Sequence, residues 1–481
     1  MLSSIYERLV AAGMRLPITW GDEVQKWGQT VALFRQYAEG DHRAKLTPEM
    51  QQMLRISGGV LDTFTLNYCD LVIAKMGDRL TVAGIDADTK PGSDWAVEVL
   101  NRNRIDGLQM DVHDAALRDG ITFVMVAPEE DGAVMLAHEL AWDGDTGIIP
   151  VYDRMGKRLL AAVKVWYETS TACRVNIYYA DRVEKYDAEL GGGLSVHLDS
   201  GMRPDETADR GEVNGVVPWM SNGQPLGVPV IPFVNRAKAR LGYGLSEIAC
   251  VIPGQDALNR TLVSMVMTAE LSAFQIKTAR GFPAPSAVAP GMIINIAPEG
   301  LGNDQIADMG VLEQASLVPF ISEAQFLIEQ MGTISQTPLP GQMGGDSASG
   351  EALKQREIGL LGKVKRFQVK AGNAWEDCMR LAATVQNAYS TQRPAPAVKR
   401  WTCRWEDADI RNDAEVIANA IKMRELVGDK EVLRLVAPVW GYTAQQIDAI
   451  LAEKRVQMAQ SLAAMRGGNL PNFDEFMVPV Q

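Results

Sequence analysis

Residues 350–389, GEALKQREIGLLGKVKRFQVKAGNAWEDCMRLAATVQNAY, carry the strongest helical pattern in the sequence. Their apolar side chains recur at alternating steps of four and three residues, which places them on one side of an α-helix. We therefore predict one long helix from about residue 350 to 388, whose apolar side packs against a core. Gly359 and Gly362 offer a place for a bend near its start. The apolar positions are Leu360, Val364, Phe367, Ala371, Ala374, Cys378, Leu381 and Val385.

Two shorter helical patterns precede this helix. The first covers residues 242–273, where Pro253 should kink or restart the helix. The second covers residues 317–331, where apolar side chains again alternate at steps of four and three. Between them, residues 274–311 are rich in loops and β-forming residues, with a strand predicted at 292–296. The chain thus places a β excursion between two helices.

A stretch of helix-breaking residues separates the second of these helices from the long one. The stretch TPLPGQMGGDSASG at 337–350 contains two prolines and many small residues, which favour turns over helix. We predict a flexible loop there. Ser349 can then cap the first turn of the long helix, and Glu351 lies where the helix dipole favours a negative charge.

The remaining sequence mixes helices with strands and predicts an α+β chain. The apolar stretch VPVIPFVN at 228–235 reads as a strand, and its two prolines favour the edge of a sheet. Residues 190–226 read as a loop or an insertion, and the chain from about 413 to 465 reads as helical. Further helices are predicted at 21–40, 60–80 and 111–120, and further strands at 121–127, 158–168, 174–180, 182–189 and 400–407.

Composition limits the possible classes of protein. The chain has 481 residues and 47% hydrophobic content, enough for large cores. Its net charge of −13 argues against a protein that grips DNA phosphates, which needs a basic excess. The five cysteines are dispersed without paired spacing, which is typical of reduced thiols. We expect a soluble protein, since no apolar run approaches the ~18 residues that a membrane span requires.

A search for catalytic motifs finds none with the required spacing. The chain has no phosphate-binding P-loop, and GYGLSE at 242–247 lacks the third glycine of a dinucleotide fingerprint. The four histidines are too far apart in sequence to indicate a zinc site, and the acidic clusters lack the spacing of a calcium loop. We predict no catalytic residue, no bound metal and no cofactor.

One charge pattern near the start of the long helix stands out. Lys363, Arg366 and Lys370 follow one another at steps of three and four, so they share a helix face. A solvated or salt-bridged face would explain this pattern. A contact with nucleic acid or with an acidic neighbouring subunit is the less expected alternative, which the sequence leaves open.

The order of these elements resembles the portal family of long-tailed bacteriophages. In that family a strand like IPFVN at 231–235 leads into a helix with a segment like QDALN at 255–259. The segment SGEAL at 349–353 matches the start of the family's long helix. No single motif is specific, and the joint order carries the resemblance over roughly residues 30–430. Two further segments resemble the family's N-terminal region, FRQYAEGDH at 34–42 and NYCDLVIAKMGDRL at 67–80.

The resemblance implies a particular layout of the chain. It implies an α+β portal fold with a wing, paired stem helices, a β-containing clip, a long kinked helix and a helical crown. The implied segments are the wing (1–243), a stem helix (244–273), the clip (274–315), the second stem helix (316–333), the tunnel loop (334–350), the long wing helix (351–390), a wing strand (391–412), and the crown with the C-terminal tail (413–481).

The resemblance also implies a function without catalysis. Twelve copies would form a ring at the portal vertex of the virion capsid, after assembly in the host cytoplasm. Double-stranded DNA would pass through it without sequence-specific binding, and an acidic wall would limit tight contact with phosphates. The implied partners are the terminase large subunit, the head–tail adaptor, and the capsid and scaffolding proteins, with no membrane. The channel-lining loop would comprise Thr337, Pro338, Pro340, Gly341, Gln342, Gly344, Gly345, Asp346, Ser347 and Ser349.

Two other functions stay open at this point. The chain could be a minor head or adaptor protein of a phage, which native mass would distinguish from a closed ring. It could also be a metal-dependent nuclease that uses Glu406, Asp407 and Asp409, provided that these carboxylates converge in a pocket. Metal-dependent cleavage of plasmid DNA by the pure protein would indicate the nuclease.

Overall fold

The chain divides into two compact units, Met1–Ala408 and Asp409–Gln481. In the second unit, residues 450–457 are helical. The structure, a computed structural model, describes residues 1–56, 65–153, 155–156, 158–168, 172–189, 194–196, 215–236, 243–273, 277–280, 293–296, 308–311, 315–340, 350–390, 393–408, 422, 432 and 450–457.

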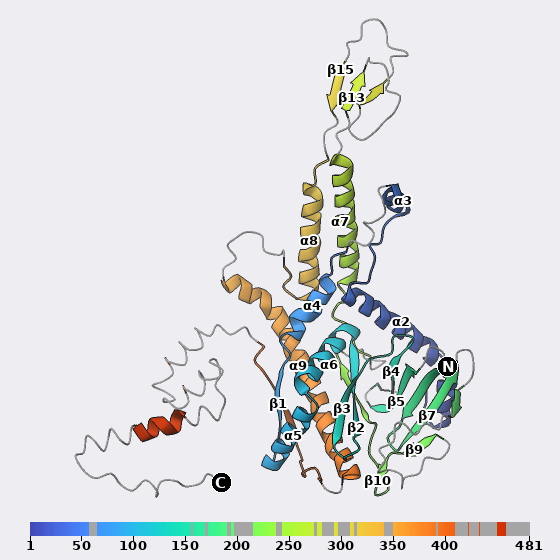
Figure 1. The fold of residues 1–481 in the computed structure, drawn as a ribbon, viewed down its shortest axis with the longest axis vertical. Coiled ribbons are helices and arrows are strands. Elements are labelled where there is room, and N and C mark those ends of the chain that lie inside the picture. Colours follow the sequence, from blue (N-terminus) through green and yellow to red (C-terminus); the bar gives the residue numbers. More distant parts are fainter. Residues whose placement is uncertain are drawn as a thin grey trace, which may run out of the picture. The chain divides into compact units, whose positions relative to one another are not determined.

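The first unit mixes helices and strands, so the α+β prediction is confirmed (Figure 1). Its described helices are α1 (Leu2–Ala11), α2 (Trp20–Glu39), α3 (Pro48–Ile56), α4 (Tyr68–Gly77), α5 (Lys90–Arg102), α6 (Ile105–Asp119), α7 (Ile252–Ala273), α8 (Val318–Ser335) and α9 (Gly350–Tyr389). Its described strands are β1 (Val82–Ala87), β2 (Ile121–Pro128), β3 (Val134–Glu139), β4 (Gly147–Tyr152), β5 (Leu159–Tyr167), β6 (Ala172–Tyr178), β7 (Arg182–Glu189), β8 (Leu194–Val196), β9 (Val216–Pro218), β10 (Met220–Ser221), β11 (Gln224–Pro225), β12 (Val230–Val234), β13 (Lys277–Arg280), β14 (Ile293–Ile296), β15 (Asp308–Val311) and β16 (Trp401–Trp405).

Two antiparallel sheets hold most of the strands of this unit. The other described strands form the antiparallel pairs β1–β16 and β10–β11 and a separate sheet of β13, β14 and β15. The larger has the strand order β4-β5-β6-β7-β8, and its strands β5, β6 and β7 confirm the strands predicted at 158–168, 174–180 and 182–189. The smaller has the order β12-β2-β3, with β12 at the edge as its prolines predicted. The prediction of a loop at 190–226 is wrong in part. This stretch contains β8 and β9, and both strands pair with the preceding strand β7. Short strands of this kind carry too little periodicity to be found in a sequence.

Each sheet packs against helices through its own core. Ile5 and Leu9 of α1, with Trp20 and Val24 of α2, are buried in one apolar cluster with the inner side chains of the larger sheet. The main core joins the smaller sheet to α4, α5, α6 and α9. In α9 all the apolar positions predicted from its period are buried, so the predicted orientation of this helix is confirmed. A long amphipathic helix therefore organises the main core.

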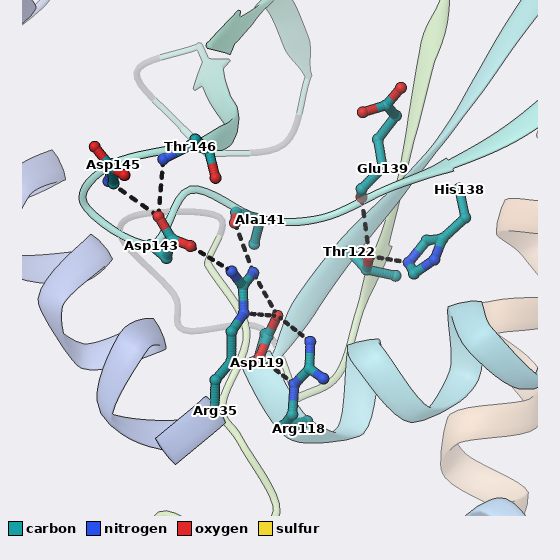
Figure 2. Close-up of polar contacts among 10 residues, drawn as sticks. All are labelled: Arg35, Arg118, Asp119, Thr122, His138, Glu139, Ala141, Asp143, Asp145 and Thr146. Atoms are coloured by element: carbon teal, nitrogen blue, oxygen red, sulfur yellow. Dashed lines mark hydrogen bonds and ion pairs between the residues drawn. The ribbon is translucent and has the colours of Figure 1, made fainter. Parts of the chain in front are cut away.

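An ion-pair network fastens α2 and α6 to the connection between the two sheets (Figure 2). The guanidinium of Arg35 lies 2.8 Å from the buried carboxylate of Asp119 at the end of α6, and 2.7 Å from that of Asp143 between β3 and β4. It also donates a hydrogen bond to the carbonyl of Ala141. Because Asp119 is fully buried and also pairs with Arg118, its charge is balanced within the protein.

Two helix starts differ from the predictions for local reasons. The helix predicted from residue 60 begins at Tyr68, because the side chain of Asn67 accepts hydrogen bonds from the next backbone amides and caps it. The helix predicted over 242–273 begins at Ile252, so that Pro253 lies in its first turn. The helix predicted for residues 243–251 is therefore wrong, and Pro253 neither kinks nor restarts a helix but begins one, where its missing amide hydrogen costs nothing.

The helices α7 and α8 lie side by side (Figure 1). Between them in the sequence, β13, β14 and β15 form a sheet of their own, with β13 in the middle. The strand predicted at 292–296 is confirmed as β14. The apolar residues Val263 and Met267 of α7 are covered by Ala44 and Leu46, which precede α3.

Candidate functional site

The predicted channel loop begins at a firmly packed stretch after α8. Gln336 takes a left-handed backbone conformation with φ 53°, and the backbone amide of Thr337 donates to the carbonyl of Gly332. Thr337 and Leu339 are buried, Pro338 is half-buried and Pro340 is exposed. The first loop residues are thus fixed on the subunit. The other loop residues predicted to line the channel lie outside the described residues: Gly341, Gln342, Gly344, Gly345, Asp346, Ser347 and Ser349.

A buried ion pair holds α9 against this loop base. The ammonium group of Lys363 lies 2.5 Å from a carboxylate oxygen of Glu247 and donates to the carbonyl of Ser335, 2.7 Å away. The side chains of Lys363 and Glu247 are only 5% and 2% exposed. Lys363 therefore joins the end of α8 to the segment before α7. Its charge is neutralised within the subunit.

Glu247 has further partners at the end of the strand motif IPFVN and directly after it. The side-chain amide of Asn235 donates to Glu247 at 2.8 Å and to the carbonyl of Leu245 at 2.9 Å. The guanidinium of Arg236 lies 3.1 Å from the same carboxylate, with its side chain partly exposed. Sequence reasoning missed this role of Asn235 and Glu247, although both stand in segments singled out for other reasons.

The segment GYGLSE places Glu247 through a close backbone crossing. A Cβ atom on Gly244 would overlap the backbone at Gly120, the left-handed residue that ends α6. Only glycine fits at position 244, because any side chain there would prevent the two backbone segments from crossing so closely. The backbone amide of Glu247 then donates to the carbonyl of Leu117, which fixes the position of the carboxylate.

Next to this ion pair lies a basic groove of about 570 Å³. We use "basic groove" for the pocket lined by Asn235, Arg236, Glu247, Lys363, Lys365, Arg366, Phe367, Val369 and Lys370. Five of these nine residues are cationic and one is acidic. The side chain of Val369 is 67% exposed in it. The structure thus brings Arg366 and Lys370 together as exposed cations, while it places their predicted companion Lys363 in the interior.

The second motif of the sequence, QDALN, holds the N-terminal region to α7. Gln255 and Asn259 are fully buried, and both bond to the backbone of Leu66. Gln255 also accepts a hydrogen bond from the backbone amide of Tyr68 at the start of α4. Asp256 accepts from the hydroxyl of Tyr37 and pairs with Lys45 at 2.6 Å. These polar residues connect the elements before residue 68 to α7.

An acidic face covers the exposed side of α4 and α6. We use "acidic face" for Asp70, Asp78, Asp111 and Asp114, all of which are exposed. The carboxyl of Asp114 lies directly over Gly77 of α4. The contact with α4 removes part of the water around this carboxyl, although the residue stays exposed. This partial desolvation, reinforced by the neighbouring carboxylates of Asp78, Asp111 and Asp70, raises the pKa of Asp114 to about 6.

This raised pKa predicts that Asp114→Asn stabilises the subunit at neutral pH. Because the folded protein holds this proton more tightly than the unfolded chain, stability is lost as the pH rises from about 4 to about 6. After allowance for screening at an exposed site, we expect a gain of ~1 kcal/mol in the free energy of unfolding at pH 7. Urea unfolding at several pH values measures it, and the gain should shrink toward pH 4. Asp106→Asn on the same helix should give no gain, and an equal gain there would contradict the assignment.

The chemistry required by the nuclease alternative does not assemble in the described residues. Among them no group of three or more His, Cys, Asp or Glu side chains could hold a metal ion. Glu406 and Asp407 lie in the described part, while Asp409 lies outside it.

Two cysteine thiols are poorly suited to nucleophilic chemistry. Burial raises the pKa of the Cys69 thiol and of the Cys403 thiol to about 12, which disfavours the nucleophilic thiolate. No helix in the part described is long and apolar enough to span a bilayer.

Comparison with known proteins gives one consistent result. Residues 64–460 match the family described as "Phage portal protein, SPP1 Gp6-like". The portal protein of Mycobacterium phage D29 is 30% identical over 224 residues, which cover 41% of this chain and 42% of that protein. The portal protein of Mycobacterium phage L5 is 26% identical over 391 residues, covering 75% and 70% of the two chains. The first of these matches spans less than half of the relative's length.

Proposed function

Because this chain belongs to the SPP1 Gp6-like family of phage portal proteins, we propose that copies of it form a closed ring at one vertex of a phage capsid. DNA enters and leaves the capsid through the central channel of this ring. The family consists of structural proteins, so the prediction that the chain is not an enzyme is confirmed. The family match also sets aside the minor head and adaptor proteins and the nuclease as alternatives.

The observation that best supports a ring is the exposed apolar surface of α8. Four large apolar side chains of this helix stay exposed on the isolated subunit, at 66%, 47%, 59% and 59%: Val318, Ile321, Phe326 and Ile334. Several large apolar side chains left exposed on one helix make that helix a candidate for a protein contact. Neighbouring copies around one axis would cover them, since a closed ring repeats one contact between two different surfaces.

The finer assignments follow the family layout and remain proposals. Residues 274–315, which contain the sheet of β13, β14 and β15, would be the clip that docks the terminase large subunit and later the head–tail connector. Residues 244–273 and 316–333 would be the stem, and 413–481 the crown and tail. Capsid and scaffolding proteins would contact the ring from outside, and double-stranded DNA would pass through it without sequence-specific contacts.

Particle imaging of the full chain tests the ring directly. Negatively stained particles should average to rings with a central hole, and native mass spectrometry should give a multiple of the 52.5 kDa subunit, twelve by the family layout. A protein that stays monomeric at every concentration would overturn the proposal.

We expect that deletion of residues 341–348 leaves rings intact and impairs the packaging or retention of DNA. The breaker composition of this stretch, between two packed helices, supports a position in the channel. Because Thr337 and Leu339 anchor the loop base in the subunit, shortening the loop beyond them should spare the fold. Packaging assays with rings of the deletion variant measure the effect. Packaging at the unmodified level would count against a channel position.

A further inference from the structure

Among the described residues of its own subunit, the basic groove has too few acidic partners. Its single carboxylate, Glu247, is already taken by Lys363 and Arg236. Lys365, Arg366 and Lys370 are exposed, and within the described residues none of them forms an ion pair. Three cations therefore stand together on a chain whose net charge is −13. Such a site attracts an anionic partner.

The shape and lining of the groove favour a protein over DNA as that partner. Val369 is 67% exposed among the cations, and Phe367 contributes to the lining. Contacts to the DNA backbone come mostly from charged and polar groups, whereas protein interfaces combine an apolar centre with a polar rim. A groove that mixes exposed apolar and cationic groups matches the second description.

The acidic face of α4 and α6 has the opposite charge, and its two carboxylates on α6 point away from the buried side of that helix. In α6 the buried residues recur at steps of four and three, and Asp111 and Asp114 lie on the opposite side of the helix. His113 of α6 packs edge-on against Phe367 of α9, at 5.7 Å between ring centres, so α9 contacts another side of α6. Within the described residues, none of the four carboxylates forms an ion pair. The subunit therefore carries two separate, complementary surfaces.

We infer that the basic groove of one subunit binds the acidic face of α4 and α6 on the neighbouring copy of the chain. This inference rests on the proposed ring and names the contact between neighbouring subunits that sets their arrangement in it. A ring of identical subunits joins two different surfaces at each subunit boundary. Each subunit therefore needs both a basic and an acidic surface. The pairing also removes like-charge repulsion between acidic copies, and it fixes which side of a subunit meets which.

Charge reversal of the two surfaces, singly and together, tests the inference. The groove variant is Arg366→Glu with Lys370→Glu, and the face variant is Asp111→Lys with Asp114→Lys. Each should fold as a subunit, by circular dichroism and thermal unfolding, but raise the protein concentration needed for half-assembly by at least about tenfold. The combined variant, with all four changes, should regain rings because the charges again match. The matched control Arg15→Glu with Lys26→Glu alters the net charge equally on exposed residues outside the groove and should assemble normally.

The outcomes separate this inference from the proposed ring. Unmodified protein that never forms rings would overturn both. If it forms rings while both reversed variants also do so, only the inference fails. If the groove variant forms rings but loses DNA packaging, the groove contacts DNA instead. Failure of the combined variant to recover, although each pair folds, would overturn the pairing with the acidic face. Should a reversed pair not fold, Arg366→Gln with Lys370→Gln gives the same test with a smaller loss that weakens as salt rises.

Discussion

Replacement of Lys363 by Met is expected to lower the free energy of unfolding by about 3–5 kcal/mol. The substitution leaves Glu247, which is 2% exposed, without its main cationic partner. It also removes the hydrogen bond to the carbonyl of Ser335 at the end of α8. A buried carboxylate without compensation is far less stable than one in water, and Arg236 is too exposed to replace the buried ammonium group fully. The packing at the base of the loop should become less stable together with the rest of the fold.

The neighbouring lysine provides the matched control. Lys365→Met removes a cation of the same kind, two residues away on the exposed side of α9, and should change stability by less than about 0.5 kcal/mol. Urea unfolding followed by circular dichroism compares the two. The double variant Lys363→Met with Glu247→Met should recover much of the loss, because no unpaired charge is left inside. Equal stability of the two lysine variants would mean that the ion pair contributes nothing.

Phe367→Ala is the second substitution with a large expected effect, a loss of about 3–5 kcal/mol in the free energy of unfolding. The ring is 3% exposed in the middle of α9 and meets His113 of α6 edge-on. Truncation removes the buried ring and leaves a cavity that the surrounding helices and sheet cannot close without moving. His113 is itself held in place, with hydrogen bonds to the carbonyl of Leu80 and to the indole of Trp375.

The control for this substitution lies two residues further along the same helix. Val369→Ala shortens an apolar side chain that is 67% exposed, so the loss should stay below about 0.5 kcal/mol. Thermal unfolding of both variants measures the difference. An unchanged melting temperature for Phe367→Ala would mean that this side of α9 is not buried. A large loss for Val369→Ala in the isolated subunit would contradict its exposed position.

Much of the fold follows from patterns that the sequence carries locally. The period of Leu360, Val364 and Phe367 identifies both the long helix and its buried side, because helical geometry repeats within a few residues. Pro232 within β12 and Pro229 just before it identify an edge strand, since a proline has no amide hydrogen to donate to a second neighbour. The pairing of β1 with β16 was not predicted, because it joins residues more than three hundred positions apart.

In the candidate site, too, some features follow from local sequence patterns and others depend on the tertiary structure. By itself the sequence determined that a loop of small residues separates two helices and that a cluster of basic residues opens the long one. Helix geometry places Lys363, Arg366 and Lys370 on neighbouring positions, but it does not say which of them meets a partner from elsewhere in the chain. Only the tertiary structure decided that Lys363 turns inward to Glu247 while Arg366 and Lys370 stay exposed. The physical reason is that a charge can be buried only where a distant part of the chain supplies its counter-charge, and the backbone crossing of Gly120 and Gly244 brings Glu247 to that place.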